Sequence, residues 1–221
     1  MTNLVKIILP YDQLAKEKIN DNYAWHKKAW TVFSHHPELK ERNKKLEKEK
    51  GPTPFLSRYT QKLHHVELLL VSDYQPNKPG WCSSEQWKSV DIDESYLSQS
   101  DYYFDLYANP TKTVKKPDGK GGYAKHGKRL TLMDKESQLE WIIRKSRNHG
   151  FTVRDDIPLQ IDKPVDHRFN RKGEKGLHIG VQFQGALHVV DYSAFKAAFC
   201  KGIGTAKGFG FGLLMIKPAQ I

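Results

Sequence analysis

Short apolar runs and one amphipathic stretch organise the first half of the chain. Apolar residues at 5–9 and 65–72 predict two strands, and residues 23–33 have the spacing of a helix. Residues 73–100 are rich in proline, serine and aspartate, so they predict a loop with one short helix near residues 84–88.

The second half has a clearer pattern. An aromatic-rich strand is predicted over 102–108, a basic hairpin over 111–129, and a helix over 134–149 with Asp134 as its cap. Four further elements follow in order: a strand from Leu177 to Phe183, a turn at Gly185 into a second strand through Val190, a helix after Asp191, and a last strand over 213–216.

Each half therefore indicates strands with two interspersed helices, which is the β-α-β-β-α-β order of a ferredoxin-like unit. The second half matches this order better than the first. We predict an α+β fold of two tandem ferredoxin-like (RRM-like) domains. Residues 1–98 form the first domain and contain the amphipathic helix, and residues 99–221 form the second.

Charge is distributed unevenly between these halves. The whole chain carries 36 Lys and Arg against 25 Asp and Glu, a net charge of +11. Residues 1–100 have a net charge of +2 (15 basic, 13 acidic) and residues 101–221 a net charge of +9 (21 basic, 12 acidic). A basic half favours a polyanionic partner such as nucleic acid, although a generic basic surface is an equal alternative on charge alone.

Several other classes are disfavoured. No run approaches the roughly 18 apolar residues of a membrane helix, and the N-terminal residues lack the pattern of a signal peptide. Cys82 and Cys200 are far apart, so we expect a reducing, cytoplasmic environment without disulfides or a cysteine zinc site. The adjacent pairs His35-His36 and His64-His65 have no standard ligand spacing, and we expect no metal, no cofactor and no membrane contact.

A glycine-rich loop over 202–212 is the strongest local signal, with five glycines in eleven positions. Glycine lets backbone amides approach a ligand closely, and a lysine among them suits phosphate. The loop fails both nucleotide-binding patterns, since Lys207 precedes its glycine and also stands where a dinucleotide loop has its third glycine. A nucleic-acid backbone is therefore the favoured ligand, with Gly204, Lys207 and Gly208 as candidate contacts, and a tight connection without any ligand is the alternative.

The hairpin over 111–129 is strongly basic, with Asp118 as its one acidic residue. Its length suits a finger laid along a duplex groove or phosphate ridge, although composition alone slightly favours a solvated loop. The candidate RNA-binding residues in it are Lys112, Lys115, Lys116, Lys120, Lys125, Lys128 and Arg129.

Tyr23 and His26 are one helical turn apart, and Lys27 and Lys28 follow directly. A histidine that titrates near neutrality moves protons, and a tyrosine hydroxyl positions or donates to a developing charge. The pair is a candidate for metal-free phosphodiester cleavage. The pattern alone favours the alternative, in which both residues belong to the hydrophobic stripe of the helix.

Several motifs together resemble the CasE family, the CRISPR-RNA endoribonuclease subunits of type I-E Cascade. Four stretches carry the match over nearly the whole chain: Tyr23-Ala-Trp-His26 before Ala29-Trp30, the strand and turn over 103–113, the helix segment from Glu140 to Lys145, and residues 183–191 leading into 202–214. The last stretch is the most specific.

The resemblance implies metal-independent cleavage of CRISPR precursor RNA at the base of the repeat hairpin. The substrate's own 2′-OH attacks the adjacent phosphate and leaves a 2′,3′-cyclic phosphate, and the protein keeps the product hairpin as a subunit of Cascade. His26 takes the role of general acid/base and Tyr23 that of its partner, which reverses the preference for a purely structural pair. The basic hairpin would follow the RNA stem, and the glycine-rich loop would pack beside the catalytic helix.

Two departures from the family pattern matter. Thr31 stands where some relatives have a lysine, so Lys27 or Lys28 would neutralise phosphate instead. Asp105 and Tyr107 stand where the family strand often has arginines, which lowers the expected contribution of this strand to RNA binding. The alternatives to the enzyme are a non-cleaving RNA-hairpin scaffold and a general single-strand RNA-binding protein.

Overall fold

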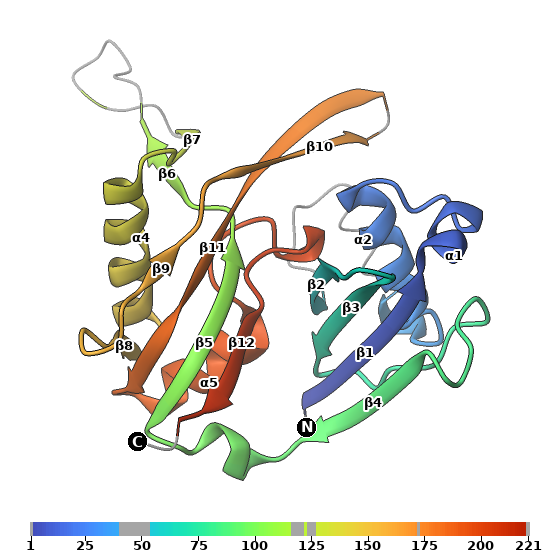
Figure 1. The fold of residues 1–221 in the computed structure, drawn as a ribbon, viewed down its shortest axis with the longest axis horizontal. Helices are drawn as coiled ribbons and strands as arrows, with labels where there is room; N and C mark the ends of the chain where they lie inside the picture. The colour runs from blue at the N-terminus through green and yellow to red at the C-terminus, as the bar shows by residue number, and fades with distance from the viewer. Residues whose placement is uncertain (1, 40–53, 116–121, 123–126, 172, 220–221) are drawn as a thin grey trace.

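The structure, a computed structural model, describes residues 2–39, 54–115, 122, 127–171 and 173–219. Two antiparallel sheets lie side by side, and helices cover them (Figure 1). The first sheet is built from residues 2–92 and the second from residues 101–218.

The first sheet has the strand order β2-β3-β1-β4. Its strands are β1 (Thr2–Pro10), β2 (Phe55–Gln61), β3 (His65–Ser72) and β4 (Trp87–Ile92). The chain forms α1 (Tyr11–Lys16) and α2 (Asn22–Thr31) after β1. Residues 73–86 connect β3 to β4 without a helix, so this unit is ferredoxin-like with its second helix missing.

The second sheet has the equivalent order β10-β11-β5-β12. Its main strands are β5 (Asp101–Ala108), β10 (Val165–Arg171), β11 (Glu174–Val189) and β12 (Leu214–Pro218), and β8 (Phe151–Val153) and β9 (Gln160–Ile161) also pair with β11. The helices α4 (Lys135–Asn148) and α5 (Tyr192–Lys201) follow β5 and β11. Both expected caps form, because the carboxylates of Asp134 and Asp191 accept from backbone N–H groups in the first turns. The α+β prediction of two ferredoxin-like units is confirmed.

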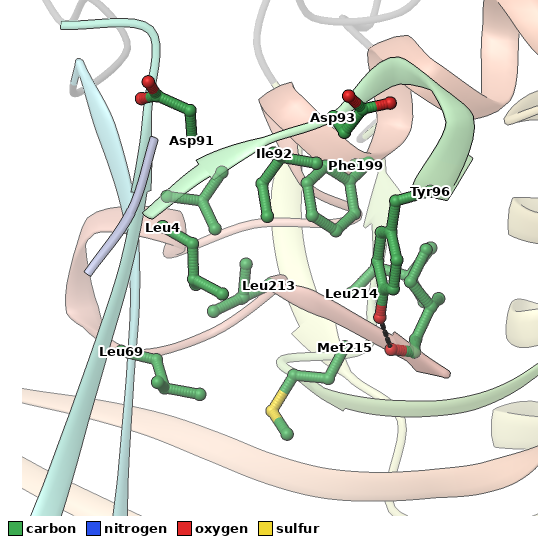
Figure 2. Close-up of a pocket in the computed structure, with 12 residues that line it drawn as sticks. Leu4, Leu69, Asp91, Ile92, Asp93, Tyr96, Phe199, Leu213, Leu214 and Met215 are labelled. Carbon is green, nitrogen blue, oxygen red and sulfur yellow. Dashed lines mark hydrogen bonds between the residues drawn. The ribbon is translucent and has the colours of Figure 1, made fainter. Parts of the chain in front are cut away.

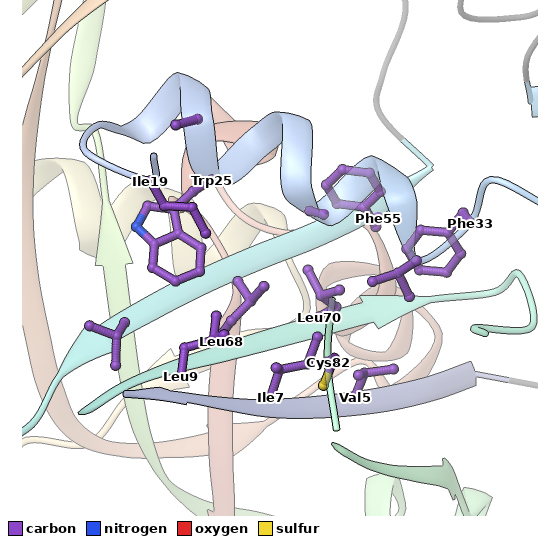
Figure 3. Close-up of a cluster of buried hydrophobic side chains, with 14 of the residues drawn as sticks. Val5, Ile7, Leu9, Ile19, Trp25, Phe33, Phe55, Leu68, Leu70 and Cys82 are labelled. Atoms are coloured by element: carbon purple, nitrogen blue, oxygen red, sulfur yellow. The ribbon is translucent and has the colours of Figure 1, made fainter. Parts of the chain in front are cut away.

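Each sheet buries its own hydrophobic face. In the first unit, alternate residues of β1 and β3 point toward α2, and Trp25 lies over Leu68 while Phe33 packs with Phe55 at the other end (Figure 3). In the second unit Trp141 of α4 stacks on Phe183 of β11, with ring centroids 5.6 Å apart. These cores fix the positions of α2 and α4 on their sheets.

A third apolar cluster joins the two sheets. Leu4 and Leu69 from the first sheet face Leu213 and Met215 from the second across a hollow of about 480 Å³ (Figure 2). The hydroxyl of Tyr96, in the 3-10 helix η1 (Glu94–Leu97), donates to the carbonyl of Ile216 at 2.5 Å. The two sheets are therefore held against each other by side-chain packing as well as by the chain.

Two predictions were wrong. The short helix near 84–88 is absent and Trp87–Ile92 is the strand β4, an edge strand with mostly exposed side chains that is held by backbone pairing to β1. Gly185 is not a turn, because β11 runs without a break through it. A Cβ at Gly185 would lie 3.2 Å from Leu159 and 3.4 Å from Phe104, so a close approach of neighbouring groups explains this glycine.

The base of the basic hairpin is confirmed. It consists of β6 (Thr111–Val114) paired antiparallel with β7 (Lys128–Thr131). The predicted turn at Asp118-Gly119 and three candidate lysines lie outside the described residues: Lys116, Lys120 and Lys125.

Candidate functional site and its relatives

The helix α2 begins at a side-chain cap, where Asp21 accepts from the backbone N–H of Ala24 at 2.7 Å. From this start, Trp25 and Ala29 face the sheet and are buried. His26 lies on a different side of the helix, against the glycine-rich loop, and is only half-buried. The helix thus has one face for the core and one for a site.

Two of the contacts of His26 fix the positions of its ring protons. Its Nδ1 lies 2.7 Å from the carbonyl oxygen of Gly208, and its Nε2 lies 3.1 Å from the indole Nε1 of Trp30. A carbonyl oxygen only accepts and an indole N–H only donates. Nδ1 therefore carries the proton, Nε2 accepts, and the imidazole is neutral with a basic Nε2.

Tyr23 lies one turn earlier on the same helix. Its ring is stacked near that of His26, with centroids 6.4 Å apart at an interplanar angle of 21°. The ammonium of Lys27 lies 5.1 Å from the centre of the Tyr23 ring. Tyr23, His26 and the exposed Lys27 thus form one side of the helix, which agrees with the predicted pair and one predicted cation.

Lys28 is placed differently. Its ammonium forms an ion pair with Glu17 and lies over the ring of Trp81, 5.3 Å from the ring centre. Thr31 accepts from the Trp81 indole at 2.9 Å and donates to the Lys28 carbonyl. Lys28 and Thr31 therefore connect α2 to the loop around Trp81, and Lys28 is not an unpaired cation beside His26.

The glycine-rich loop packs beside α2, as the resemblance implies. It contains the 3-10 turn η2 (Lys207–Phe209), and the ring of Phe209 stacks on His26 with centroids 4.8 Å apart at 14°. Gly204 and Gly210 have φ values of +92° and +93°, in the region where side chains are strained, and Ala206 has φ +58°. The loop thus needs its glycines for its backbone path.

Lys207 has a structural contact. Its ammonium donates to the carbonyl of Lys201, the last residue of α5, at 2.7 Å. A cation at this position satisfies a free carbonyl at the negative end of the helix. Burial, followed by the charges of Lys145 and Lys201, lowers the pKa of Lys207, so several cations converge behind the loop.

The described cations of the basic hairpin are exposed. Lys112, Lys115, Lys128 and Arg129 all lie on β6, β7 or directly after β6. Lys112 also lines a small hollow against α4, together with Trp141 and Arg144. The hydroxyl of Thr205 in the glycine-rich loop donates to the carbonyl of Asn109 at 3.2 Å, which ties this loop to the base of the hairpin.

The two departures in β5 have structural roles. Asp105 forms an ion pair with Arg58 of the first sheet at 2.5 Å and accepts from the side-chain amides of Gln182 and Gln184 at 2.5 and 3.0 Å. The hydroxyl of Tyr107 lies 2.5 Å from Nε2 of His167. Asp105 therefore joins the two sheets, whereas Tyr107 contacts another strand of its own sheet.

Sequence reasoning missed the groups that hold His26. The helical spacing of residues 23–33 does not mark Trp30 as a hydrogen-bond donor, and the sequence predicts Gly208 only as a contact to RNA. The signal for Trp30 was present, since it follows His26 by four residues, which puts two side chains on one helical face. Gly208 is 182 residues away from His26, and no local pattern reveals such a contact.

Within the described ranges, no three His, Cys, Asp or Glu side chains are grouped as ligands of a metal ion. In the same part of the chain, no helix is long and apolar enough to cross a membrane.

Comparisons with known proteins connect these features. A curated relative, the CRISPR system Cascade subunit CasE of Escherichia coli K12, is 29% identical over 209 residues, which is 93% of this chain and 96% of that protein. The CRISPR-associated endoribonuclease Cse3 of Thermus thermophilus is 30% identical over 124 residues, covering 52% of this chain and 54% of that protein. Solved structures of CRISPR endoribonuclease Cse3 bound to a 19-nucleotide RNA (22% identity, 98% of this chain and 100% of that chain, TM-score 0.73) and of Cas6e from Escherichia coli K-12 (24% identity, 99% and 100%, TM-score 0.63) have the same fold. The sequence pattern that defines the family described as "CRISPR associated protein" extends over residues 3–218, so this chain, with both of its sheets, belongs to that family.

Proposed function

We propose that the chain is a metal-independent endoribonuclease that cleaves CRISPR precursor RNA at the base of the repeat hairpin and then keeps the product hairpin. Family membership and the names of the two curated relatives, a Cascade subunit and an endoribonuclease, support the class of reaction. The observation that carries the mechanism is the hydrogen-bonding of His26, because it leaves a basic nitrogen on a helix face that also holds Tyr23 and Lys27.

The reaction begins with removal of a proton from the substrate's 2′-OH by Nε2 of His26. The 2′ oxygen attacks the adjacent phosphorus, the bond from phosphorus to the 5′ oxygen breaks, and the 5′ oxygen takes up the proton that Nε2 of His26 has gained. The products are a 2′,3′-cyclic phosphate and a 5′-OH. A proton on Nε2 and a hydrogen bond from Trp30 to Nε2 exclude one another, so the Trp30 contact opens when the 2′-OH arrives.

Tyr23 is proposed as the partner of His26 that positions or donates to the reacting phosphate. Its ring lies beside the imidazole, and its hydroxyl belongs to the same helix face. Lys27 supplies positive charge near this phosphate. Lys28 stays a weaker candidate, because Glu17 already neutralises it.

The hairpin of the repeat is proposed to lie along the exposed cations of β6 and β7. A-form RNA hides its base edges in a deep, narrow groove, so contacts to phosphates and 2′-OH groups dominate such binding. Lys116, Lys120 and Lys125 extend the same run of charge in the sequence. Gly204, Lys207 and Gly208 would support the RNA backbone beside α2, with Lys207 contributing charge from its place at the end of α5.

We also propose two domains, 1–98 and 99–221, supported by the two sheets and by the position of η1 between them. As partners we propose the CRISPR repeat hairpin and the other subunits of Cascade, in the cytoplasm. The two free thiols agree with a reducing compartment.

The test is incubation of the purified protein with a labelled repeat hairpin in excess EDTA. Wild type is expected to cut once at the base of the stem and leave a cyclic phosphate, and His26→Ala is expected to bind the hairpin without cutting. His64→Ala, which changes an exposed histidine in the β2–β3 connection, is the matched control and should cut normally. Tight binding without cleavage by wild type would refute the nuclease and support the non-cleaving scaffold.

A further inference from the structure

A relay of hydrogen-bonded polar side chains lies behind the turn that holds His26. It begins at the hydroxyl of Tyr107 on β5, which is 2.5 Å from Nε2 of His167 on β10. Nδ1 of His167 lies 3.4 Å from the hydroxyl of Tyr59 on β2, and this hydroxyl contacts Oδ1 of Asn22 on α2. Nδ2 of Asn22 then donates to the carbonyl of Phe209 at 3.0 Å.

The direction of these hydrogen bonds follows from the last link. Because the amide nitrogen of Asn22 donates to Phe209, its Oδ1 accepts, and the Tyr59 hydroxyl must donate to it. Tyr59 then accepts from Nδ1 of His167, so Nε2 of His167 has no proton and accepts from Tyr107. Each hydrogen bond from Tyr107 on β5 to the glycine-rich loop therefore has one donor and one acceptor, with no conflict between them.

Burial keeps the side chains of this relay uncharged. It lowers the pKa of His167, raises the pKa of Tyr107 to about 12 and raises the pKa of Tyr59 above its usual range. All three groups are thus neutral at pH 7, as the arrangement of donors and acceptors requires.

The last hydrogen bond of the relay, at Phe209, is adjacent to the contact that sets the His26 tautomer. Phe209 follows Gly208, whose carbonyl accepts from Nδ1 of His26, and the Phe209 ring stacks on the imidazole. Residues on both sides of this turn, Ala206 and Gly210, have left-handed φ values of +58° and +93°. A turn with such backbone angles persists only when its surroundings hold it in place.

We infer that Tyr107, His167, Tyr59 and Asn22 are positioning residues for cleavage: they hold the Gly208-Phe209 turn so that its carbonyl keeps the proton of His26 on Nδ1 and leaves Nε2 as the base. This inference rests on the proposed role of His26. It also makes the active site depend on both sheets, because two of the four residues come from the first sheet or its helix and two from the second.

The test compares Tyr59→Phe with wild type in two measurements. Tyr59→Phe removes one hydroxyl and keeps the ring that stacks on Trp25 at 5.3 Å. In RNA-free protein, ¹⁵N NMR of the His26 ring is expected to change from the Nδ1–H tautomer to a mixture with Nε2–H. Single-turnover cleavage is expected to fall at least about tenfold, since general acid-base catalysis contributes about 10²–10⁴-fold. The Kd for a hairpin with a 2′-deoxy group at the cleavage site should stay within about twofold, because a positioning defect leaves binding intact.

Tyr96→Phe is the matched control. Like Tyr59→Phe, it removes one partly buried tyrosine hydroxyl. This hydroxyl donates to the backbone carbonyl of Ile216 where the two sheets meet (Figure 2). It should change neither the tautomer nor the cleavage rate. Tyr107→Phe is the second relay variant, used if Tyr59→Phe does not fold, and should shift both readouts in the same direction but less.

The outcomes separate the two proposals. A wild-type tautomer and rate in the folded relay variants would overturn the positioning role. If His26→Ala cleaves normally, the proposed catalytic role of His26 fails, and the tautomer measurement still decides whether the relay sets the state of His26.

Discussion

Removal of the Asp105 carboxylate is expected to cost more stability than removal of any ordinary surface charge. Arg58, its partner on the first sheet, is only 6% exposed, and its guanidinium lies 2.5 Å from Asp105 and 3.3 Å from the Gln182 side-chain oxygen. In Asp105→Ala this guanidinium loses the carboxylate and keeps only neutral acceptors, the Gln182 side-chain oxygen and the backbone carbonyl of residue 105 at 3.5 Å. Breaking a buried ion pair from one side costs about 3–5 kcal/mol, so we expect a loss near the lower value, about 3 kcal/mol, because Asp105 itself is partly exposed.

The measurement is equilibrium unfolding in urea. For a chain of this size, 1 kcal/mol lowers Tm by about 2–4 °C, so a parallel thermal scan should show a decrease of about 6–12 °C. The matched control is Asp156→Ala, which removes the outer carboxylate paired with Arg154 at 2.5 Å. That carboxylate is half exposed, so its removal should change the free energy of unfolding much less than the removal of Asp105.

The double variant Arg58→Met/Asp105→Leu gives an independent check. It removes both charges and keeps the volume, so it should be more stable than Asp105→Ala. A loss below about 1 kcal/mol in Asp105→Ala, or a double variant less stable than the single one, would refute the reasoning. Either result would mean that water reaches Arg58 and that the pair contributes little to the contact between the sheets.

Three further predictions concern charge, pH and backbone geometry. Lys27→Ala should weaken hairpin binding and reduce the salt dependence of the binding constant by about one counterion. Lys28→Ala should leave this salt dependence unchanged, because Glu17 already pairs with Lys28. Binding titrations at several salt concentrations distinguish the two variants. Burial, with a smaller effect of the neighbouring His167, lowers the pKa of His178 to about 4 in the folded state. The unfolded chain therefore binds the proton first, and this group should lower stability by about 3 kcal/mol as pH falls from about 6.5 to about 4. In urea unfolding, His178→Phe should lack this contribution and lose less stability than wild type over the same pH range. Gly210→Ala should lower the free energy of unfolding by about 1–2 kcal/mol and slow cleavage, since φ is +93° and the new Cβ would lie 3.0 Å from the Tyr59 ring, whereas Gly80→Ala has nothing within 4 Å and should be neutral.

Local chemistry made some elements predictable. The start of α4 follows from Asp134, whose side chain caps the helix, and its end follows from Gly150, which has φ +80°. The strand β3 has the predicted bounds, because Val66, Leu68 and Leu70 alternate as buried residues within one short, mainly apolar run. In each case the determining residues are neighbours in the sequence.

Other elements depend on distant partners. β4 has mainly exposed side chains and is a strand because β1 offers it an edge, so its own residues contain no signal. Gly185 signals a turn by its type, but the tertiary structure uses it to admit Leu159 and Phe104. The two wrong predictions thus concern a glycine and an edge strand, whose conformations depend on the groups that pack against them.

The same distinction holds for the candidate site. Tyr23 and His26 were recognisable as a pair, but only the resemblance to a family favoured chemistry over a hydrophobic stripe. The structure supplies what the pattern lacked: a carbonyl and an indole that leave one imidazole nitrogen basic. Asp105 is the reverse case, since the family pattern presents it as a lost RNA contact and the fold uses it as a link between sheets.

This arrangement explains how a single histidine would suffice for the proposed reaction. The nucleophile and the leaving group both belong to the RNA, so the protein has to place one phosphate, remove one proton and return one. A neutral imidazole with Nε2 as acceptor is suited to the removal, and the imidazolium formed is then suited to the return. Nδ1 keeps its proton throughout and donates it in a hydrogen bond to the Gly208 carbonyl. The glycine-rich turn, and the groups that hold that turn, are therefore part of the catalytic apparatus.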